Sequence, residues 1–527
     1  MDEAYDVVVI GGGAAGLSGA LALARARRSV LVVDSGQPRN APAGHVHNYL
    51  TRDGTPPAEL VAAGRAEVVR YGGQVVDGQV AAATKDGDGF TVTLVDGGFV
   101  GARRLLVTTG LVDELPDVPG LAGRWGRDVL HCPYCHGWEV RDRRIGVLAT
   151  EPRAVHQAQL WRQLSPHVLL LLHGVPAPAA DDAERLAARA ITVVEGPVAG
   201  LVVAGDALTG VRLASGEVVE LDAMAVAPRF TARSGVLESL GLKPVDAEIG
   251  GEVVGSQIPA DPAGATAVPG VWVAGNVADV RAQVIGAAAA GLNAAAAINA
   301  DLVADDTRAA VDAYRDRIAT MFERPAWEQR YQAKPALWSG QPNVQLIAEA
   351  SGLPPGRALD VGCGEGADAI WLAERGWRVT AVDIAQTALD RAAGHAAATG
   401  AEVAGRIEWT RADLRAEPPA ADAYDLVSAQ YMHLPGEQRR ELFARLAAAV
   451  APGGTLLIVG HDLSDLRTTA HRMHLPDAMF TAEELGAALD PTEWQVLATD
   501  RRPRAAADHD GHEVAVHDAV LVARRRS

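Results

Sequence analysis

The sequence predicts an α/β protein assembled from successive strand–helix–strand units with parallel sheets. The apolar, β-branched segment Tyr5–Ile10 is followed directly by the glycine-rich loop Gly11–Gly16 and a helix pattern of small residues. The apolar segment Ala358–Val361 is followed in the same way by Gly362–Gly366. A strand, a glycine loop and a helix in this order are typical of dinucleotide-binding βαβ units. We therefore expect Rossmann-like domains in both halves of the chain.

Length and charge narrow the class of protein. The chain has 527 residues, enough for about three to four domains of ordinary size. Its 48 Lys and Arg against 66 Asp and Glu give a formal charge of −18, which disfavours nucleic acid and anionic lipid as partners. Apolar runs such as Val168–Leu172 are too short to span a bilayer, and the N-terminus leads into a strand instead of a signal peptide. We expect a cytoplasmic protein that binds no membrane.

The first glycine loop has the spacing of a dinucleotide site. Gly11 would make the tight turn, Gly13 would let the backbone approach a pyrophosphate, and Gly16 would let the helix pack closely on the strand. The next predicted strand, Val30–Val33, ends in Asp34, whose carboxylate could hold an adenosine ribose hydroxyl.

Residues 132–139, Cys-Pro-Tyr-Cys-His-Gly-Trp-Glu, hold two of the three cysteines of the chain. One thiolate of a C-x-x-C pair can attack a disulfide while the other resolves the mixed disulfide. Zinc normally needs four ligands, no second cysteine pair exists, and His131 and His136 lie too close in sequence for a zinc finger. We therefore favour a redox pair over a metal site or a passive buried pair.

A second segment indicates the same dinucleotide. Residues 270–279, Gly-Val-Trp-Val-Ala-Gly-Asn-Val-Ala-Asp, precede an Ala/Gly-rich helix, and the strand Leu105–Gly110 ends in Thr-Thr-Gly. With the first glycine loop and the cysteine pair, residues 1–305 resemble the thioredoxin-reductase-like flavoproteins. The resemblance implies FAD, held by Gly11, Gly13, Gly16, Asp34, Gly110, Gly275, Asp279 and Gln283.

The same resemblance assigns roles around the cysteine pair. It implies that Cys135 lies against the flavin and that Cys132 exchanges with substrate. His136 occupies the place where many relatives carry an acidic proton donor, so it could act as a general base or acid, or be only a helix-surface residue. Glu139 is a weaker candidate that could serve only as a cap.

The segment between the two flavin motifs departs from the family. After the predicted strand Arg144–Leu148, residues 149–154 read Ala-Thr-Glu-Pro-Arg-Ala, without glycine. The next strand, Val168–Leu172, ends in His173 and Gly174, where NADPH-using relatives present arginines. Backbone approach to a nucleotide phosphate is therefore expected to be blocked.

This departure favours electron transfer to oxygen. The eight-residue segment 132–139, which holds the cysteine pair, and the glycine-free loop 149–154 resemble those of the dithiol oxidases of the gliotoxin and holomycin types. These enzymes use no nicotinamide. Two alternatives stay open: an NADPH-dependent thioredoxin or disulfide reductase that binds its nucleotide in an altered pose, and a flavin-bearing redox sensor. The expected substrate is a small-molecule thiol or dithiol, with a thioredoxin-like protein as a further option.

The C-terminal part resembles the class I S-adenosylmethionine-dependent methyltransferases. The strand Ala358–Val361, the loop Gly362-Cys-Gly-Glu-Gly366, and the strand Val379–Val382 followed by Asp383 carry the likeness. An NAD site is the competing interpretation, which this order of motifs disfavours. Cys363 lies inside the loop and is expected to be structural. The resemblance implies S-adenosylmethionine, held by Asp360, Gly362, Gly364, Gly366, Asp383, Asp413 and Leu414.

The methyl acceptor is poorly defined by the sequence. Tyr431, His433 and His461 fall at carboxyl ends of predicted strands, where substrates bind in open α/β sheets. Histidines also occur at 471, 474, 509, 512 and 517, but without carboxylates or cysteines at a ligand spacing, so no metal is predicted.

The predicted organisation is a flavoprotein with two dinucleotide-binding domains, followed by a methyltransferase domain. The FAD-binding domain comprises 1–115 and 231–305, and a degenerate pyridine-nucleotide-like domain with the cysteine pair comprises 116–230. Residues 306–335, charged and then rich in proline and aromatic residues, are a linker or a methyltransferase lid, and 336–527 form the methyltransferase. A homodimer through the flavoprotein part is expected. The fusion suggests that both domains act on one thiol.

Overall fold

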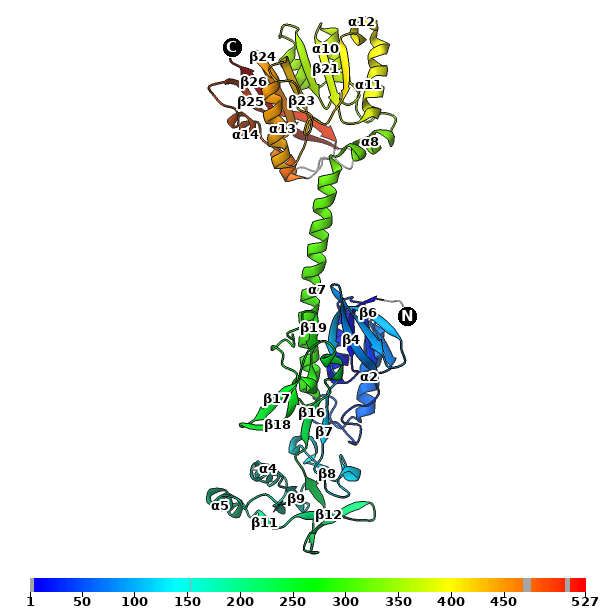
Figure 1. The fold of residues 1–527 in the computed structure, drawn as a ribbon, viewed down its shortest axis with the longest axis vertical. Helices are drawn as coiled ribbons and strands as arrows, with labels where there is room; N and C mark the ends of the chain where they lie inside the picture. The colour runs from blue at the N-terminus through cyan, green and yellow to red at the C-terminus, as the bar shows by residue number, and fades with distance from the viewer. Residues whose placement is uncertain (1–3, 152, 468–474, 508–511) are drawn as a thin grey trace. The chain divides into compact units, whose positions relative to one another are not determined.

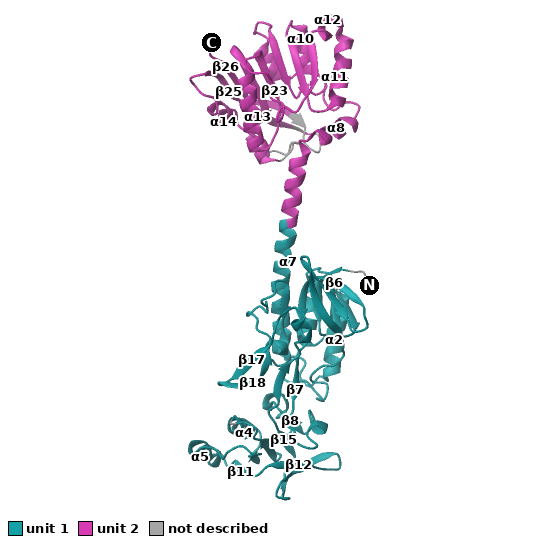
Figure 2. Ribbon diagram, viewed as in Figure 1, with its two compact units in different colours: residues 1–308 teal, residues 309–527 magenta. Residues whose placement is uncertain are grey.

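The computed structural model describes residues 4–151, 153–467, 475–507 and 512–527. Within them the chain divides into two compact units, Met1–Arg308 and Ala309–Ser527 (Figure 2). The division falls inside one continuous helix, α7 (Val284–Met321), and so lies close to the predicted end of the FAD-binding domain at residue 305.

The domain of unit 1 that is predicted to bind FAD is built on a largely parallel sheet (Figure 1). Its strands, in spatial order, are β3 (Gln74–Asp77), β2 (Val30–Asp34), β1 (Ala4–Ile10), β6 (Phe99–Val107), β5 (Gly89–Leu94) and β4 (Val80–Asp86), with β19 (Val271–Val273) paired to β6. Alternate residues of β1 face opposite sides. Val7 and Val9 pack against α1 (Ala14–Arg25), α2 (Pro57–Arg70) and α7, whereas Val8 and Ile10 pack toward β4, β5 and α6 (Gly235–Glu238).

The second domain of unit 1 has a small parallel sheet with helices α4 (Ala154–Trp161) and α5 (Ala180–Ala188). The strands, in spatial order, are β11 (Thr192–Val194), β10 (Val168–Leu171), β9 (Ile145–Leu148), β15 (Ala223–Ala225) and β8 (Val129–Leu130). An antiparallel sheet of β12 (Val198–Ala204), β13 (Ala207–Leu213) and β14 (Val218–Glu220) belongs to it.

The chain passes between the two domains of unit 1 through paired strands. The sheet has the order β17 (Val245–Ile249), β18 (Glu252–Gln257), β16 (Arg229–Ala232) and β7 (Leu111–Glu114). β7 leaves the FAD-binding domain, and β16 returns to it antiparallel to β7. The predicted boundary at 230/231 therefore falls inside β16, and that at 115/116 directly follows β7.

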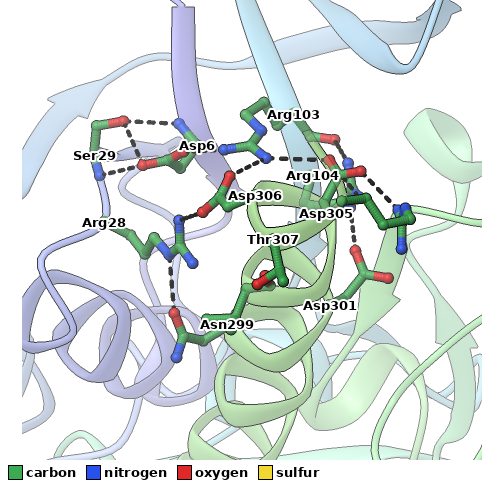
Figure 3. A network of polar contacts seen from close by, with 12 residues as sticks. Asp6, Arg28, Ser29, Arg103, Arg104, Asn299, Asp301, Asp305, Asp306 and Thr307 are labelled. Carbon is green, nitrogen blue, oxygen red and sulfur yellow. Dashed lines mark hydrogen bonds and ion pairs between the residues drawn. The ribbon is translucent and has the colours of Figure 1, made fainter. Parts of the chain in front are cut away.

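Helix α7 is anchored to unit 1 by an apolar face and by charge. Among the described residues it is the helix long and apolar enough to cross a membrane, a test that core helices of soluble proteins also pass. Its face from Ala287 to Leu302 is buried against the sheet. Beyond this face, Asp305 and Asp306 bind Arg103 of β6, and Asp306 also binds Arg28 (Figure 3). Burial and these ion pairs show that the first part of α7 is a core helix of unit 1.

Unit 2 contains one extended sheet. Its strands, in spatial order, are β22 (Ile407–Arg411), β21 (Arg378–Asp383), β20 (Arg357–Val361), β23 (Tyr424–Gln430), β24 (Val450–His461), β26 (Glu513–Arg525) and β25 (Trp494–Ala507). Strands β22 to β24 are parallel, and β26 is antiparallel to both its neighbours. The core against one face includes α9 (Val344–Ala350), α10 (Ala367–Glu374), α11 (Gln386–Thr399) and α12 (Ala401–Ala404). The core against the other includes α13 (Gly436–Ala449) and α14 (Ala482–Ala487).

The segment predicted as a linker, 306–335, is helical over most of its length. It comprises the end of α7 and α8 (Arg324–Gln332). Tyr331 of α8 is 2% exposed and packs on Ala385 and Ala388, and Glu328 accepts a hydrogen bond from the Thr387 backbone N–H. α8 is thus part of unit 2.

Candidate active sites

The first glycine loop has the shape of a dinucleotide cradle. Gly11 has φ +108°, and a Cβ there would lie 2.6 Å from the Thr108 carbonyl oxygen. A Cβ on Gly16 would lie 1.9 Å from the carbonyl oxygen of Gly11, whereas a Cβ on Gly13 would meet nothing within 4 Å. Gly13 therefore faces open space at the N-terminus of α1, where an anionic phosphate is stabilised.

The cradle opens into a cavity of about 1570 Å³ within unit 1. This volume exceeds that of most small-ligand pockets, as a dinucleotide requires, so the residues fit FAD. The lining includes these predicted FAD and catalytic residues: Gly11, Gly13, Asp34, Gly110, Gly275, Gln283, Cys132, Cys135 and His136.

Two predicted FAD residues do not line the cavity. Gly16 packs α1 against the loop, as its contacts above require. Asp279 accepts a hydrogen bond from the Arg281 backbone N–H at 3.0 Å, and its side chain is half exposed. This hydrogen bond shapes the turn that follows Gly275–Val277, and the role of Asp279 as a cofactor ligand stays a prediction.

Arg39 was missed by the sequence reasoning. It lies in the loop after β2 and donates two hydrogen bonds to Asp113, at 2.6 and 2.8 Å, and one to Asn276 at 3.2 Å. All three residues line the cavity. Its positive charge makes a small contribution to the lowered pKa of Cys132 and slightly opposes the rise in the pKa of Cys135. The position of Arg39, shortly after the predicted cofactor ligand Asp34, was the sequence feature that could have marked it as a site residue.

The two cysteines are chemically unequal. Cys132 caps the short helix α3 (Pro133–His136), and its sulfur accepts a hydrogen bond from the Cys135 backbone N–H at 3.2 Å. The hydrogen bond from the Cys135 side chain lowers the pKa of Cys132 to about 7, while the same bond and burial raise the pKa of Cys135. Near neutral pH, Cys132 therefore carries the thiolate, the form that reacts with disulfides.

His136 lies beside this pair as a neutral base. Burial lowers its pKa, and its Nε2 atom is buried without a hydrogen-bond partner among the described residues. His136 lines the cavity, and a neutral imidazole there can take a proton from an incoming thiol.

A loop from the FAD-binding domain completes the surroundings of His136. His47 Nε2 lies 3.2 Å from the Glu139 carboxylate, and His47 Nδ1 lies 3.4 Å from Asp53. The Asn48 side chain donates a hydrogen bond to the Tyr134 carbonyl oxygen at 2.6 Å. The structure thus gives Glu139 a histidine partner that the sequence did not reveal, because the two residues come from different domains.

The degenerate loop lies at the same cavity. Arg153 pairs with Glu151 at 2.5 Å and with Glu252 of β18 at 3.2 Å; Pro152 lies outside the described residues. Arg153, His156 and Gln157 line the cavity. After β10, His173 Nδ1 accepts a hydrogen bond from the Val198 backbone N–H at 2.9 Å. The described part of this loop offers ion-paired side chains where a phosphate site needs exposed backbone N–H groups.

The glycine loop of unit 2 also forms a cradle. Gly362, Gly364 and Gly366 all have positive φ, of 66°, 54° and 90°. Asp383 is buried and accepts hydrogen bonds from the backbone N–H groups of Gly364 and Ala385. These glycines and the neighbouring carboxylate fit S-adenosylmethionine, whose ribose hydroxyls Asp383 would bind.

Buried carboxyl and thiol groups surround this loop. Burial raises the pKa of Asp360, Asp383 and Cys363. Asp360 is 2% exposed, and its Oδ2 atom has no hydrogen-bond partner among the described residues. Because buried polar atoms are normally paired, this atom is available to bind a ligand. The elevated pKa of Cys363 agrees with the structural role predicted for it. Leu414 is buried in the core.

Asp413 and the segment before the glycine loop occupy defined positions. Arg415 binds the Asp413 carboxylate, at 2.7 Å for its closest nitrogen.

The segment before β20 packs on the glycine loop. Glu365 accepts hydrogen bonds from the backbone N–H groups of Leu337 and Trp338, and a Cβ on Gly364 would lie 3.0 Å from the Trp338 indole nitrogen. Trp338 thus packs against the glycine loop.

Among the described residues, no group of His, Cys, Asp and Glu is arranged to hold a metal. His471, His474 and His509 lie outside the described residues.

Comparisons with known proteins agree with the flavin site. The profile of the pyridine nucleotide-disulphide oxidoreductase family matches residues 5–295, more than half of the chain. The chain belongs to this family. A methyltransferase domain profile matches residues 358–454. The protein is therefore an enzyme with an oxidoreductase part, whose family binds FAD, and an S-adenosylmethionine-dependent methyltransferase part, as predicted.

Similar proteins cover the oxidoreductase part. The chain is 36% identical to thioredoxin reductase tcpT of Claviceps purpurea over 255 residues, covering 45% of this chain and 78% of the relative. It is 31% identical to thioredoxin reductase sirT of Leptosphaeria maculans over 323 residues, covering 58% and 96%. The crystal structure of HlmI is 47% identical with a TM-score of 0.57, covering 60% of this chain and 99% of that one. Oligomeric state and compartment stay predictions.

Proposed function

We propose that the flavoprotein part oxidises a small-molecule dithiol to a disulfide with oxygen as the final acceptor. The observation that carries this proposal is the segment 149–154, which has no glycine. Within it, Arg153 forms ion pairs with Glu151 and with Glu252 of β18. A pyrophosphate needs close backbone approach and free N–H groups. Reduction by NADPH is disfavoured on this ground.

The cysteine pair would accept electrons by thiol–disulfide exchange. With Cys132 and Cys135 joined as a disulfide, one substrate thiolate attacks the Cys132 sulfur and the S–S bond breaks, leaving Cys135 as a thiolate. The second substrate sulfur then attacks the first, which forms the substrate disulfide and releases Cys132. The low pKa of Cys132 makes it a good leaving group. His136 takes the proton of the attacking substrate thiol.

The two electrons that the cysteine pair takes from the substrate must pass to a further acceptor. When bound, FAD supplies a two-electron acceptor for the reduced cysteine pair and a donor to oxygen. The sum is dithiol plus O2 giving disulfide plus H2O2. The cavity shared by the FAD cradle and the cysteine pair supports this route.

The methyltransferase part would methylate a thiol of the same class of substrate. Disulfide closure and S-methylation are two ways to mask one reactive dithiol, which gives a reason for their fusion. Methyl transfer is an in-line displacement that depends mainly on alignment. Asp383 and the glycines at 362, 364 and 366 would hold the methyl donor, which supplies a methyl group on a sulfonium.

The competing function is a disulfide reductase fed by NADPH. The names of the relatives tcpT and sirT, both thioredoxin reductases, favour it. Oxygen consumption with a small dithiol separates the two. The proposed oxidase consumes one O2 and forms one H2O2 per disulfide without added nucleotide, and Cys135→Ser abolishes this. Turnover that appears only with NADPH and a disulfide would contradict the oxidase.

A further inference from the structure

Three ring side chains gather beyond the carboxyl ends of β23 and β24 in unit 2. Tyr431 directly follows β23, His433 lies two residues on, and His461 ends β24. The rings of His433 and His461 are stacked, with centroids 4.5 Å apart and 23° between their planes. The ring centroids of Tyr431 and His461 lie 4.8 Å apart. The three rings therefore lie together, and we name them the ring cluster.

The ring cluster adjoins the cofactor loop. β20, which leads into this loop, pairs with β23, and β23 pairs with β24. A Cβ on Gly362 would lie 2.4 Å from the sulfur of Met432, so the segment 431–433 packs onto the first glycine of the loop. In open α/β sheets this edge binds ligands. A methyl acceptor on the ring cluster would therefore be next to the methyl donor.

The backbone at Tyr431 is strained. Its φ is +55°, which is unusual for a bulky residue and persists only where surrounding contacts enforce it. The Tyr431 N–H donates a hydrogen bond to the Val459 carbonyl oxygen at 2.7 Å, which fixes the turn next to β24. Such strain is common at functional sites.

The three rings differ in what they can do with a proton. Burial raises the pKa of Tyr431 to about 12, so its phenol stays protonated, next to Asp518, which Arg504 pairs at 3.3 Å. His433 Nδ1 lies 3.1 Å from the Ala478 carbonyl oxygen. Because a carbonyl only accepts, Nδ1 of the neutral ring carries the hydrogen and Nε2 carries the lone pair. The protonated phenol cannot accept a proton from a thiol, whereas an imidazole nitrogen with a lone pair can.

We propose that the ring cluster is the methyl-acceptor site and that His433 Nε2 takes the proton of a bound thiol. This inference rests on the thiol acceptor of the proposed function. The S–H bond breaks and its proton moves to His433. The sulfur forms a bond to the methyl group, whose bond to the donor sulfonium breaks with the electron pair left on the donor as a thioether. His433 then releases the proton to water.

The test compares two acceptor thiols in the full-length protein. An alkyl thiol is mostly protonated near about pH 8 and needs the base, whereas an electron-poor aryl thiol is already ionised and does not. For His433→Asn, kcat with the alkyl thiol falls by about 100-fold or more. With the aryl thiol it falls by no more than about threefold. Calorimetry without any acceptor shows the same affinity for S-adenosylmethionine as the unaltered protein.

Phe480→Leu is the matched structural variant. Phe480 packs against His433 with ring centroids 6.1 Å apart but cannot move a proton, so its loss slows both thiols by the same factor. An equal loss with both thiols in His433→Asn would overturn the proton-acceptor role. If the unaltered protein methylates hydroxyls or amines but no thiol, the thiol acceptor of the proposed function fails, and this inference with it.

Discussion

The two strand–loop–helix turns of unit 1 differ in their glycine content and in the ion pairs of their side chains. After β1, the loop contains Gly11, Gly13 and Gly16, and at Gly13 it leaves open space at a helix N-terminus. After β9, the corresponding segment has no glycine, and its side chains are tied up in the ion pairs of Arg153. One turn offers an open glycine cradle, and the described part of the other offers ion-paired side chains. The difference teaches that the same βαβ framework can be kept while the residues of its first turn change completely.

The largest expected effect on dithiol oxidation is at the cysteine pair, which lines the same cavity as residues of both turns. Cys132→Ser removes the thiolate that exchanges with substrate, so dithiol oxidation falls by about 10⁴-fold or more. The flavin content, measured by absorbance, stays the same because the FAD cradle is untouched. Cys363→Ala, which changes the third cysteine, leaves dithiol oxidation intact. Turnover within about tenfold of the original would refute the exchange role.

The comparison of the two turns can be broken by an alanine substitution in each. Gly16→Ala places a Cβ 1.9 Å from the Gly11 carbonyl oxygen, so the free energy of unfolding falls by about 1–3 kcal/mol and the purified protein contains less FAD. Its matched control, Thr150→Ala, alters an exposed residue of the other turn and changes neither quantity. Equal flavin loss in both variants would mean that the second turn also supports cofactor binding.

The pH dependence of alkylation sharpens the assignment of the reactive thiol. The pKa of Cys132 is lowered to about 7, so its thiolate fraction rises as pH rises through that value. Alkylation of the reduced protein at Cys132 should accelerate about tenfold from about pH 6 to about pH 8, followed by mass spectrometry of the labelled peptide. Cys135, whose pKa is raised, should lag throughout. Faster labelling of Cys135 would reverse the assigned roles.

The smallest effect is expected at the ion pairs of the second turn. Arg153→Ala removes partly exposed pairs with Glu151 and Glu252, so denaturant titration should show a loss below about 1 kcal/mol. NADPH should still fail to reduce the flavin, because the missing glycines are not restored. Reduction by NADPH in this variant alone would show that the ion pairs, and not the loop backbone, block the nucleotide.

Local patterns predicted the two glycine loops, the cysteine pair and the strands that lead into the glycine loops. Gly11 and Gly364 adopt the positive φ that their motifs require, since such turns depend on adjacent residues. His47 could not be predicted, because its contact with Glu139 joins segments about 90 residues apart from two domains.

The predicted end of the flavoprotein part shows a second limit. The charged stretch after residue 305 suggested a linker, yet α7 continues to Met321. Arg103 and Arg28, far away in sequence, bind Asp305 and Asp306 (Figure 3). Solvated Arg, Asp and Ala residues also sustain a helix beyond the core that buries its first half.

The most direct test mixes the oxygen-free, oxidised protein with either a small dithiol or NADPH and follows the flavin absorbance at about 450 nm. The proposed oxidase predicts rapid bleaching by the dithiol, no bleaching by NADPH, and return of colour with H2O2 on admission of air. Rapid bleaching by NADPH would contradict it and establish a reductase whose second turn binds nucleotide despite its missing glycines.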